Sequence, residues 1–251
     1  KRQGRRVDLE VDRGCQQLKG ENFVNDGKQL VYHEQENGKR IQWHTLSVPR
    51  GGEYKLVLAD GTRVWLNAAS ELMYPDHFSA DQRKVVLKGE AYFEVTKDVK
   101  RPFSVVLGDM EVKVLGTSFN VSAYPGVKRQ TTLIEGQVAV NWHRQQVVIR
   151  PGQQAAETDE GLRVASVNVM NYVGWKEHRF VYENKLLGEV LEDLERWYDV
   201  EVFVMHDEIR NLHLTANLPR YENMDKVLEI IEYAACVKFE VKGRTVVVRR
   251  D

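Results

Sequence analysis

YKLVLADGTRVWLN, residues 54–67, is the stretch that decides the fold class. It contains two runs in which apolar and polar residues alternate, and the dipeptide Asp60-Gly61 lies between them. Alternation with a period of two is typical of a strand that buries one face. Asp-Gly favours a type I′ turn, because both central residues of that turn need a positive φ. The stretch therefore predicts a β-hairpin.

Similar runs continue to about residue 165, with Gly, Pro, Asp or Asn at most corners. Many short strands without a long intervening helix favour an all-β architecture over an α/β fold. We predict a mainly β domain over residues 28–170, either a sandwich or a solenoid-like antiparallel stack. Residues 1–27 are polar and are predicted to be a flexible leader that follows a removed membrane segment. The later runs are KVVLKGEAYFEV (84–95), PFSVVL (102–107), MEVKVLGTSFNVSAY (110–124), QTTLIEGQVAV (130–140) and QVVIRPGQQA (146–155).

The pattern changes near residue 170. Two later segments carry apolar residues at helical spacing, and runs with strand-like alternation surround them. Asn223 is a candidate cap for the second helix, because an amide oxygen can accept from the free N–H groups of a first turn. Residues 171–251 are therefore predicted to be a connector and a small α+β domain of order β-α-β-β-α-β-β. The helical residues are Leu187, Val190, Leu191, Leu194, Val227, Leu228 and Ile231.

Composition narrows the function classes. The 251 residues include 36 Lys and Arg against 37 Asp and Glu, for a formal net charge of −1, whereas a nucleic-acid binder usually has a basic face. No run of about 18 apolar residues occurs, so a membrane span is not predicted within these residues. The two cysteines, Cys15 and Cys236, are too few for a disulfide framework. Cys236 follows an apolar helical segment and is expected to behave as a small buried hydrophobe.

Motifs for catalysis, metals or cofactors are missing. The seven histidines show no i,i+3 or i,i+4 pair, and neither a phosphate loop nor a G-x-S-x-G elbow occurs. Glu90 and Glu94 are spaced to share a strand face, as glycosidase carboxylates could be, but such pairs are common on exposed strands. Trp43, Trp65 and Trp142 leave a carbohydrate-binding β-module as the alternative function. We expect a non-enzymatic protein without metal or cofactor.

Alternation predicts that Val112, Val114, Phe119 and Val121 face a core, and the dipeptide Gly116-Thr117 interrupts this pattern within KVLGTSFNV, residues 113–121. A glycine inside a strand pattern usually marks a bulge or a close approach of another main chain. It could also mark a strained bond. A threonine hydroxyl can attack the preceding carbonyl, and glycine leaves room for that attack. Gly116 and Thr117 are therefore the candidate catalytic residues, for self-cleavage only.

Several motifs, in this order, resemble the FecR family of anti-sigma regulators. Residues 180–248 also resemble the small domain that follows FecR cores, which is similar in layout to the short N-terminal domain of secretins and TonB-dependent transporters. The FecR-like motifs are LADGTRVWLNAASELMYP (58–75), KGEAYFEVTKDVKRPFSV (88–105), VLGTSFNVSAYP (114–125), TTLIEGQVAV (131–140) and RPGQQA (150–155).

The resemblance implies a single-pass inner-membrane protein. A cytoplasmic N-terminal segment, expected to lie outside these residues, would bind an extracytoplasmic-function sigma factor. This chain would be the periplasmic part, which senses the signalling domain of a TonB-dependent outer-membrane transporter and so controls nutrient-uptake genes. Some family members also cleave themselves at a Gly-Thr bond, and that motif falls on Gly116-Thr117.

Partner binding is expected in the C-terminal domain, where the strands around residues 212–218 and 245–248 should include at least one sheet edge. Such an edge accepts a partner strand by main-chain hydrogen bonds, and the helix 191–200 could add to the contact. The alternative is that residues 246–248 form an interior strand. The candidate partner-binding residues are Trp197, Leu214, Ala216, Thr245, Val246, Val247 and Val248.

Overall fold

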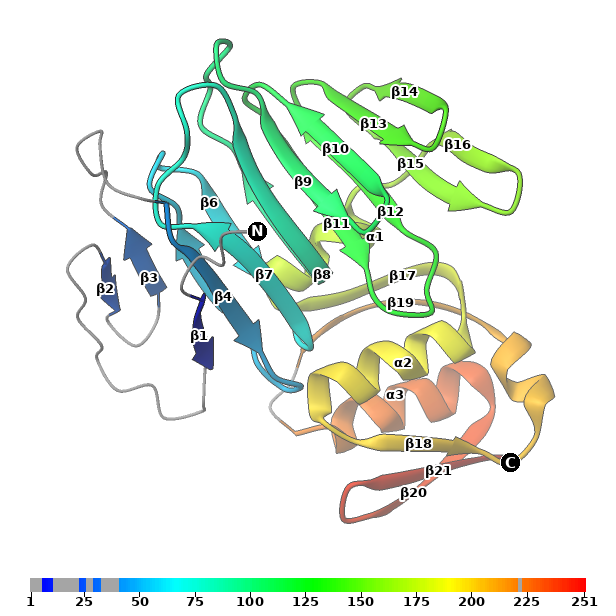
Figure 1. Cartoon of the computed structure of the whole chain (residues 1–251). Coiled ribbons are helices and arrows are strands. Elements are labelled where there is room, and N and C mark those ends of the chain that lie inside the picture. The colour runs from blue at the N-terminus through cyan, green and yellow to red at the C-terminus, as the bar shows by residue number, and fades with distance from the viewer. Residues whose placement is uncertain (1–5, 11–22, 26–28, 33–40, 221–222) are drawn as a thin grey trace. The chain divides into compact units, whose positions relative to one another are not determined.

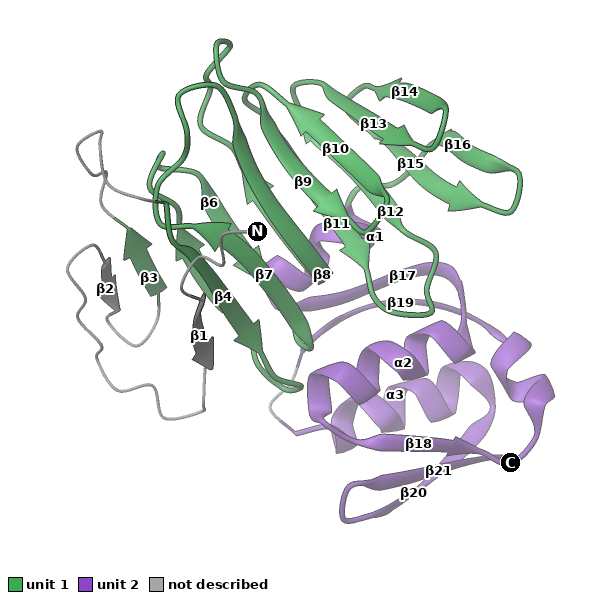
Figure 2. Ribbon diagram, in the orientation of Figure 1, with its two compact units in different colours: residues 1–169 green, residues 170–251 purple. Residues whose placement is uncertain are grey.

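The computed structural model describes residues 6–10, 23–25, 29–32, 41–220 and 223–251, and only the main chain of residues 6–10 and 23–25. The chain divides into two compact units, residues 1–169 and residues 170–251 (Figure 2). Each unit has its own hydrophobic core. The first is mainly β and the second is α+β, as predicted from the sequence.

The first unit is built from strands labelled in Figure 1. They are β1 (Arg6–Glu10), β2 (Phe23–Asn25), β3 (Gln29–Tyr32), β4 (Trp43–Val48), β5 (Tyr54–Val57), β6 (Arg63–Leu66), β7 (Ser70–Pro75), β8 (Arg83–Glu94), β9 (Phe103–Leu107), β10 (Met110–Val114), β11 (Ser118–Ala123), β12 (Gln130–Glu135), β13 (Val138–Trp142), β14 (Gln145–Ile149), β15 (Gln153–Thr158) and β16 (Gly161–Ser166).

The hairpin predicted around Asp60-Gly61 is present, but its turn type was predicted wrongly. Strands β5 and β6 pair antiparallel, and the Gly61 N–H donates to the Leu58 carbonyl. Gly61 has φ +81°, whereas Asp60 does not have a positive φ. The connection is therefore longer than a type I′ turn, with a single left-handed glycine near its end. The Asp60 carboxylate is held by other contacts, described below, which favour this turn.

Strand β8 joins two sheets. Its first half pairs with β7 and β9 in a first sheet, and its second half pairs with β6 and β11 in a second sheet. The change occurs at Gly89, which has φ +91°. A Cβ at this position would lie 2.7 Å from the Cα of Ser70, so only glycine permits this close approach. The Ser70 hydroxyl then accepts from the Glu90 N–H, at 2.9 Å.

From β9 onward the chain alternates between the sheets two strands at a time. Hairpins β9–β10 and β13–β14 belong to the first sheet, and β11–β12 and β15–β16 to the second. The architecture thus combines the two predicted alternatives, because it has two layers and is stacked in successive pairs. Among the described strands of this unit, three pairings are parallel rather than antiparallel: β1 with β4, β3 with β5, and β8 with β9.

The core of this unit is made by the alternating residues of both sheets. Phe93 and Phe119, on neighbouring strands of the second sheet, stack with ring centroids 5.2 Å apart. Phe103 of the first sheet approaches Phe93 at 6.1 Å. Burying an aromatic side chain of this size contributes about 1.5–3 kcal/mol. As the alternation predicted, Val112, Val114, Phe119 and Val121 are all buried.

Strands β1 and β2 lie inside residues 1–27, for which no regular structure was predicted. β1 pairs with β4, whose residues lie more than 30 positions later, and β2 pairs with β3. A strand that depends on so distant a partner has no local signal beyond its own weak alternation.

The second unit has the predicted order β-α-β-β-α-β-β after a short helical connector. Strands β17 and β19 form one antiparallel pair, and a second sheet has the order β18-β21-β20. The predicted helical residues are buried in a common core. The elements are α1 (Met170–Val173), the 3-10 turn Gly174–Glu177, β17 (Arg179–Leu186), α2 (Leu187–Tyr198), β18 (Glu201–Val204), the 3-10 turn Asp207–Asn211, β19 (His213–Pro219), α3 (Asp225–Ala235), β20 (Val237–Lys242) and β21 (Thr245–Arg250).

Both ends of α3 can be compared with the sequence. The Asn223 side chain accepts from the Asp225 N–H at 2.8 Å, as expected for a capping residue. Cys236, however, is exposed rather than buried. It ends the helix in the left-handed conformation, with φ +52°, and this directs its side chain away from the core. Cys15 lies outside the described residues.

Candidate functional site

Gly116 and Thr117 lie in the link between β10 and β11, where the chain crosses from the first sheet to the second. The dipeptide therefore interrupts the strand pattern but belongs to neither strand. Two other crossings between the sheets lie against this link. One is the loop 95–102, between β8 and β9, and the other is the turn 136–137, between β12 and β13.

Close approach of main chains explains the glycine. A Cβ at Gly116 would lie 2.6 Å from the Cα of Lys97 in the loop 95–102. On the other side, a Cβ at Gly136 would lie 2.8 Å from the Thr117 hydroxyl and 3.1 Å from the Gly116 carbonyl oxygen. Contacts below 3.0 Å force one of the chains to move. The close-approach interpretation of Gly116 is therefore confirmed.

Hydrogen bonds hold the same link in place. The Val95 N–H donates to the Thr117 carbonyl at 3.0 Å, and the Asp98 N–H donates to the Leu115 carbonyl at 2.8 Å. The buried Thr117 hydroxyl donates to the Gln137 carbonyl at 3.1 Å. A carbonyl oxygen accepts this hydrogen bond but cannot take the proton, so attack on Gly116 would require the hydroxyl to change partners.

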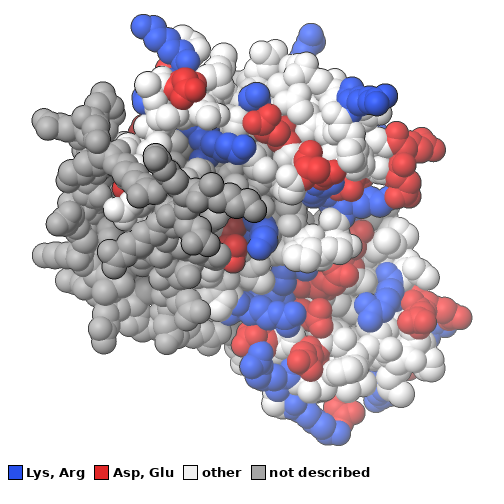
Figure 3. Space-filling model, viewed as in Figure 1, with Lys and Arg blue, Asp and Glu red and all other residues white. Residues whose placement is uncertain are grey.

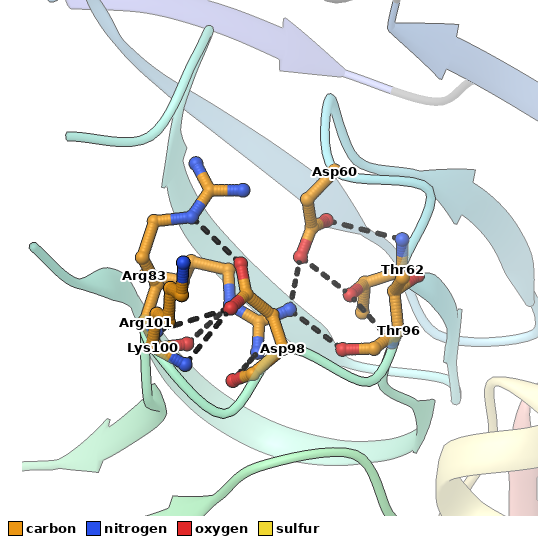
Figure 4. Close-up of polar contacts among 7 residues, drawn as sticks. All are labelled: Asp60, Thr62, Arg83, Thr96, Asp98, Lys100 and Arg101. Carbon is orange, nitrogen blue, oxygen red and sulfur yellow. Dashed lines mark hydrogen bonds and ion pairs between the residues drawn. The ribbon is translucent and has the colours of Figure 1, made fainter. Parts of the chain in front are cut away.

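The loop 95–102 is held by Arg83, whose side chain is fully buried (Figure 4). Its guanidinium forms an ion pair with Asp60 at 2.7 Å. It also donates to the carbonyl oxygens of Thr96 and Arg101, each at 2.8 Å. A buried charge is tolerated only when it is paired and hydrogen-bonded, and Arg83 meets both conditions.

Three further hydrogen bonds complete this cluster, which we call the Arg83 hub (Asp60, Thr62, Arg83, Thr96, Asp98 and Arg101). The Thr62 N–H and hydroxyl donate to the Asp60 carboxylate at 3.0 and 2.8 Å. Asp98 accepts from the Arg101 side chain at 2.8 Å, and this hydrogen bond is the main reason why the pKa of Asp98 is lowered. The hub thus fixes the β5–β6 turn to the loop that packs on Gly116.

The carboxylate and tryptophan candidates have structural partners. Glu90 accepts from the side-chain amides of Asn67 and Asn120, at 2.7 and 2.9 Å. Glu94 forms an ion pair with Arg63 at 2.6 Å. Trp43 is on β4, Trp65 on β6 and Trp142 on β13, and no two of these strands are neighbours. The structure therefore does not bring the three tryptophans into one groove.

The prediction that residues 245–248 form a sheet edge in the second unit is wrong. β21 is the central strand of its sheet, with β18 on one side and β20 on the other. Val246 and Val248 are buried, whereas Thr245 and Val247 alternate with them on the opposite, outer face of the sheet. The alternative prediction of an interior strand is the correct one, because β21 has partners along both sides.

The other strand for which an edge was predicted does have one, because β19 pairs only with β17 among the described strands. Leu214 is buried on β19, and Ala216 is half-buried on the same strand. Trp197 is half-buried at the end of α2, with the Arg220 guanidinium 4.3 Å from its ring centroid. Of the predicted partner-binding residues, only Thr245 and Val247 lie together on an accessible sheet face.

Two exposed apolar residues on this sheet face were missed by the sequence prediction. Phe203 on β18 is 55% exposed, and Met205, directly after β18, is 60% exposed. Phe203 is opposite Val247 in the sheet register. The sequence EVFVM, residues 201–205, nevertheless indicates such a surface. A strand with one exposed face normally has polar residues at alternate positions, whereas Phe203 and Met205 are apolar.

Charges and metal ligands support no second site. Basic and acidic side chains are interspersed on the face in Figure 3, without a large area of one sign among the residues drawn in colour. In the described part of the chain, no group of three or more His, Cys, Asp or Glu could hold a metal ion. None of the described helices is long and apolar enough to span a membrane.

Comparisons with known proteins agree with this architecture. A model described as FecR protein matches residues 44–139, and a model described as FecR, C-terminal matches residues 179–248. Two crystal structures of a proposed anti-sigma factor from Parabacteroides distasonis each have a TM-score of 0.77. They are 27% and 26% identical to this chain, and the matches cover 82% and 83% of it and 99% of each solved chain. No curated protein sequence matches.

Proposed function

Because this chain belongs to the FecR family of anti-sigma factors, we propose that it is the periplasmic sensing region of a transmembrane anti-sigma factor. In this proposal it receives a signal from a TonB-dependent outer-membrane transporter. It passes the signal to an extracytoplasmic-function sigma factor that binds a cytoplasmic segment of the same protein. The membrane helix and that segment would lie outside these residues, and the chain would work at the periplasmic face of the inner membrane.

The observation that carries the proposal is the combination of two separately folded units. In the β unit, the links between the two sheets pack against one another around a buried ion pair, as expected for a rigid support. The α+β unit exposes two large apolar side chains on one sheet face, which is typical of a protein contact. A relay needs such a division, because one part must hold its position while the other binds the partner.

Calorimetry tests the proposed partner. The full chain is titrated with the purified N-terminal signalling domain of the TonB-dependent transporter encoded beside it. Saturable binding with one-to-one stoichiometry is the expected result. Absence of heat and of complex formation, at concentrations well above the micromolar range, would contradict it. A saturable change in tryptophan fluorescence on adding polysaccharides would instead favour the carbohydrate-binding alternative.

We also propose self-cleavage at Gly116-Thr117, supported by the space that Gly136 leaves beside the Thr117 hydroxyl and the Gly116 carbonyl oxygen. The hydroxyl oxygen would attack the Gly116 carbonyl carbon, the C–N bond would break, and the new amine would take the proton. Water would then hydrolyse the ester, leaving a Gly116 carboxylate and a free Thr117 amino group. This change acts only on the chain itself.

Intact-mass measurement of the full-length protein after expression tests cleavage. Two fragments meeting at residues 116 and 117 are expected. Thr117→Ala should give one species, while the neighbouring Ser118→Ala should still give two. A single intact species from the unmodified protein would contradict the proposal.

A further inference from the structure

The α+β unit contains two copies of one helix–strand segment, 37 residues apart. Residues 187–204 form α2 and β18, and residues 224–241 contain α3 and most of β20. Four positions are buried in both copies, and six of the eighteen positions are identical. The buried pairs are Val190 and Val227, Leu191 and Leu228, Leu194 and Ile231, and Val200 and Val237.

The two copies also end alike. Asp199 and Cys236 terminate their helices in the left-handed conformation, with φ of +55° and +52°. Glu195 of the first copy accepts from the Val202 N–H at 2.8 Å. The equivalent Glu232 accepts from the Phe239 N–H at 2.7 Å. The strands β18 and β20 are therefore equivalent outer strands of one sheet, with β21 between them.

Each glutamate carboxylate accepts from a main-chain N–H on the side of its strand that faces away from β21. The Glu201 N–H donates to the carbonyl of Arg244, directly before β21, and the Met205 N–H donates to the Val248 carbonyl of β21. The Val202 N–H therefore points away from that strand. The carboxylate of Glu195 fills this position, as Glu232 does on β20. The edges formed by β18 and β20 are thus both partly blocked against a further strand. Their capacity for main-chain pairing is therefore similar, and only their side chains differ.

The outward-facing side chains of the two strands differ sharply in chemistry. β20 carries Lys238, Glu240 and Lys242, the polar pattern normal for an exposed sheet face. The equivalent positions of the first copy are Glu201, Phe203 and Met205. The second copy therefore shows that this fold tolerates charged residues at these outward-facing positions. The aromatic ring and thioether at Phe203 and Met205 are therefore not a requirement of the fold.

We propose that the outer face of this sheet, centred on Phe203 and Met205, is the surface on which the transporter's signalling domain docks. This inference rests on the proposed function and adds the place and chemistry of the contact. Phe203 is opposite Val247, so the apolar area continues onto the central strand. Apolar anchors surrounded by charged residues are the usual composition of a binding hot spot.

Charge defines the partner's complementary surface. Val204 is opposite Val248, which places Met205 beside Arg249, and Arg249 is opposite Lys238. Lys238 pairs with Glu232 at 3.6 Å, so Arg249 is the basic residue that borders the apolar area near Met205. The partner should present an apolar patch with a carboxylate next to it, since such pairing steers the encounter and sets the orientation.

The test uses the full chain and the purified signalling domain of the transporter. Phe203→Glu should weaken binding at least about 10-fold, as expected for a hot-spot residue, and Met205→Glu should weaken it less. Arg249→Glu should weaken binding and reduce its dependence on salt. Tyr233→Glu is the matched control, because Tyr233 on α3 is 91% exposed in the same unit and should bind as the unmodified chain does. Circular dichroism and thermal unfolding establish that each variant is folded.

The outcomes separate the two proposals. If the unmodified chain binds and Phe203→Glu binds equally well, this surface is wrong while the proposed function stands. Loss of binding in Tyr233→Glu but not in Phe203→Glu would move the contact to α3 and overturn the inference. If the unmodified chain does not bind, both proposals fail. Sedimentation that shows a dimer of this chain, disrupted by Phe203→Glu, would identify a second copy as the occupant and also overturn it.

Discussion

Two arginine residues in the β unit each join distant segments of the chain, but one is fully buried and the other is partly exposed. Arg83, at the centre of its hub, is fully buried and joins the β5–β6 turn to the loop 95–102. Arg129 has a side chain that is 17% exposed, and it donates to Glu157 at 2.6 Å and to the Leu107 carbonyl at 2.6 Å. Both hold segments that are far apart in the sequence. The difference in burial predicts that the first is essential and the second only helpful.

Electrostatics gives the reason for that difference. A charge with no water around it depends wholly on its protein partners, and removing one partner of a buried pair costs about 3–5 kcal/mol. A charge near the surface regains water when its partner is lost, so exposed pairs contribute about 0.2–1 kcal/mol. Arg129 is intermediate, because its guanidinium also lies over the Trp142 ring at 5.4 Å.

The largest effect is expected for Arg83→Met. The change leaves Asp60 buried without its cation, and the free energy of unfolding should fall by about 3–5 kcal/mol. Denaturant unfolding of the full chain measures it. Adding Asp60→Asn should restore part of the loss, because the amide no longer buries a charge. A loss below about 1 kcal/mol for Arg83→Met would contradict the view of the hub as essential.

The next effect is expected for Gly116→Ala. The added Cβ would meet the main chain of Lys97, and overpacking of this kind costs about 1–3 kcal/mol. In an Arg83→Met background the loop 95–102 is less firmly held, so Gly116→Ala should lower the free energy of unfolding by a smaller amount. A double-mutant cycle measures this coupling. Strict additivity would show that the hub does not press the loop onto Gly116.

A smaller effect is expected for Arg129→Ala, about 1–2 kcal/mol near neutral pH. Hydrogen bonds from Arg129 are the main cause of the lowered pKa values of Asp109 and Glu157. Carboxyl groups with a lowered folded-state pKa stabilise the fold above their ordinary pKa values near 4, and this contribution disappears as the pH falls through the folded-state values.

The pH series therefore separates the two clusters. Stability of the unmodified chain should fall from pH 5 to pH 2, and the Arg129→Ala variant should lose less over that range. The lowered pKa of Asp98, caused mainly by Arg101, remains in that variant, so some acid dependence should persist. Equal acid dependence in both proteins would contradict the role given to Arg129.

The smallest effect is expected for Lys128→Ala. Lys128 pairs with Asp159 at 2.9 Å, but these side chains are 55% and 92% exposed. The loss should stay below about 0.5 kcal/mol. Denaturant unfolding at low and high salt measures it, and a loss comparable to that of Arg129→Ala would show that burial is not the controlling variable.

Prediction from sequence worked wherever the signal was local. Alternation identified the three buried valines and Phe119 on the two sides of Gly116, and helical spacing identified α2 and α3. Errors occurred where the outcome depended on a distant neighbour. Asp60 was assigned to a type I′ turn, but its carboxylate binds Arg83 from another strand. Cys236 was expected to be buried, but the helix ends at that residue and turns it outward.

The candidate site shows the same limit. Thr245, Val246, Val247 and Val248 were correctly read as a strand, yet the sequence did not say that this strand would be central. The residues that lie on the accessible face beside it, Phe203 and Met205, are about 40 positions earlier in the chain. The repeat that exposes their unusual chemistry becomes clear only when the two helix–strand segments are seen to be equivalent.

By itself the sequence determined the mainly β character of the first unit, the element order of the second and the resemblance to FecR proteins. These follow from periodicity and motifs, which act over a few residues. Tertiary structure alone decided that β8 serves both sheets, that crossings stack against Gly116 and Gly136, and that Arg83 is buried among them. Pairing and burial depend on contacts between distant residues, and an alternating strand can satisfy its buried face against more than one neighbour.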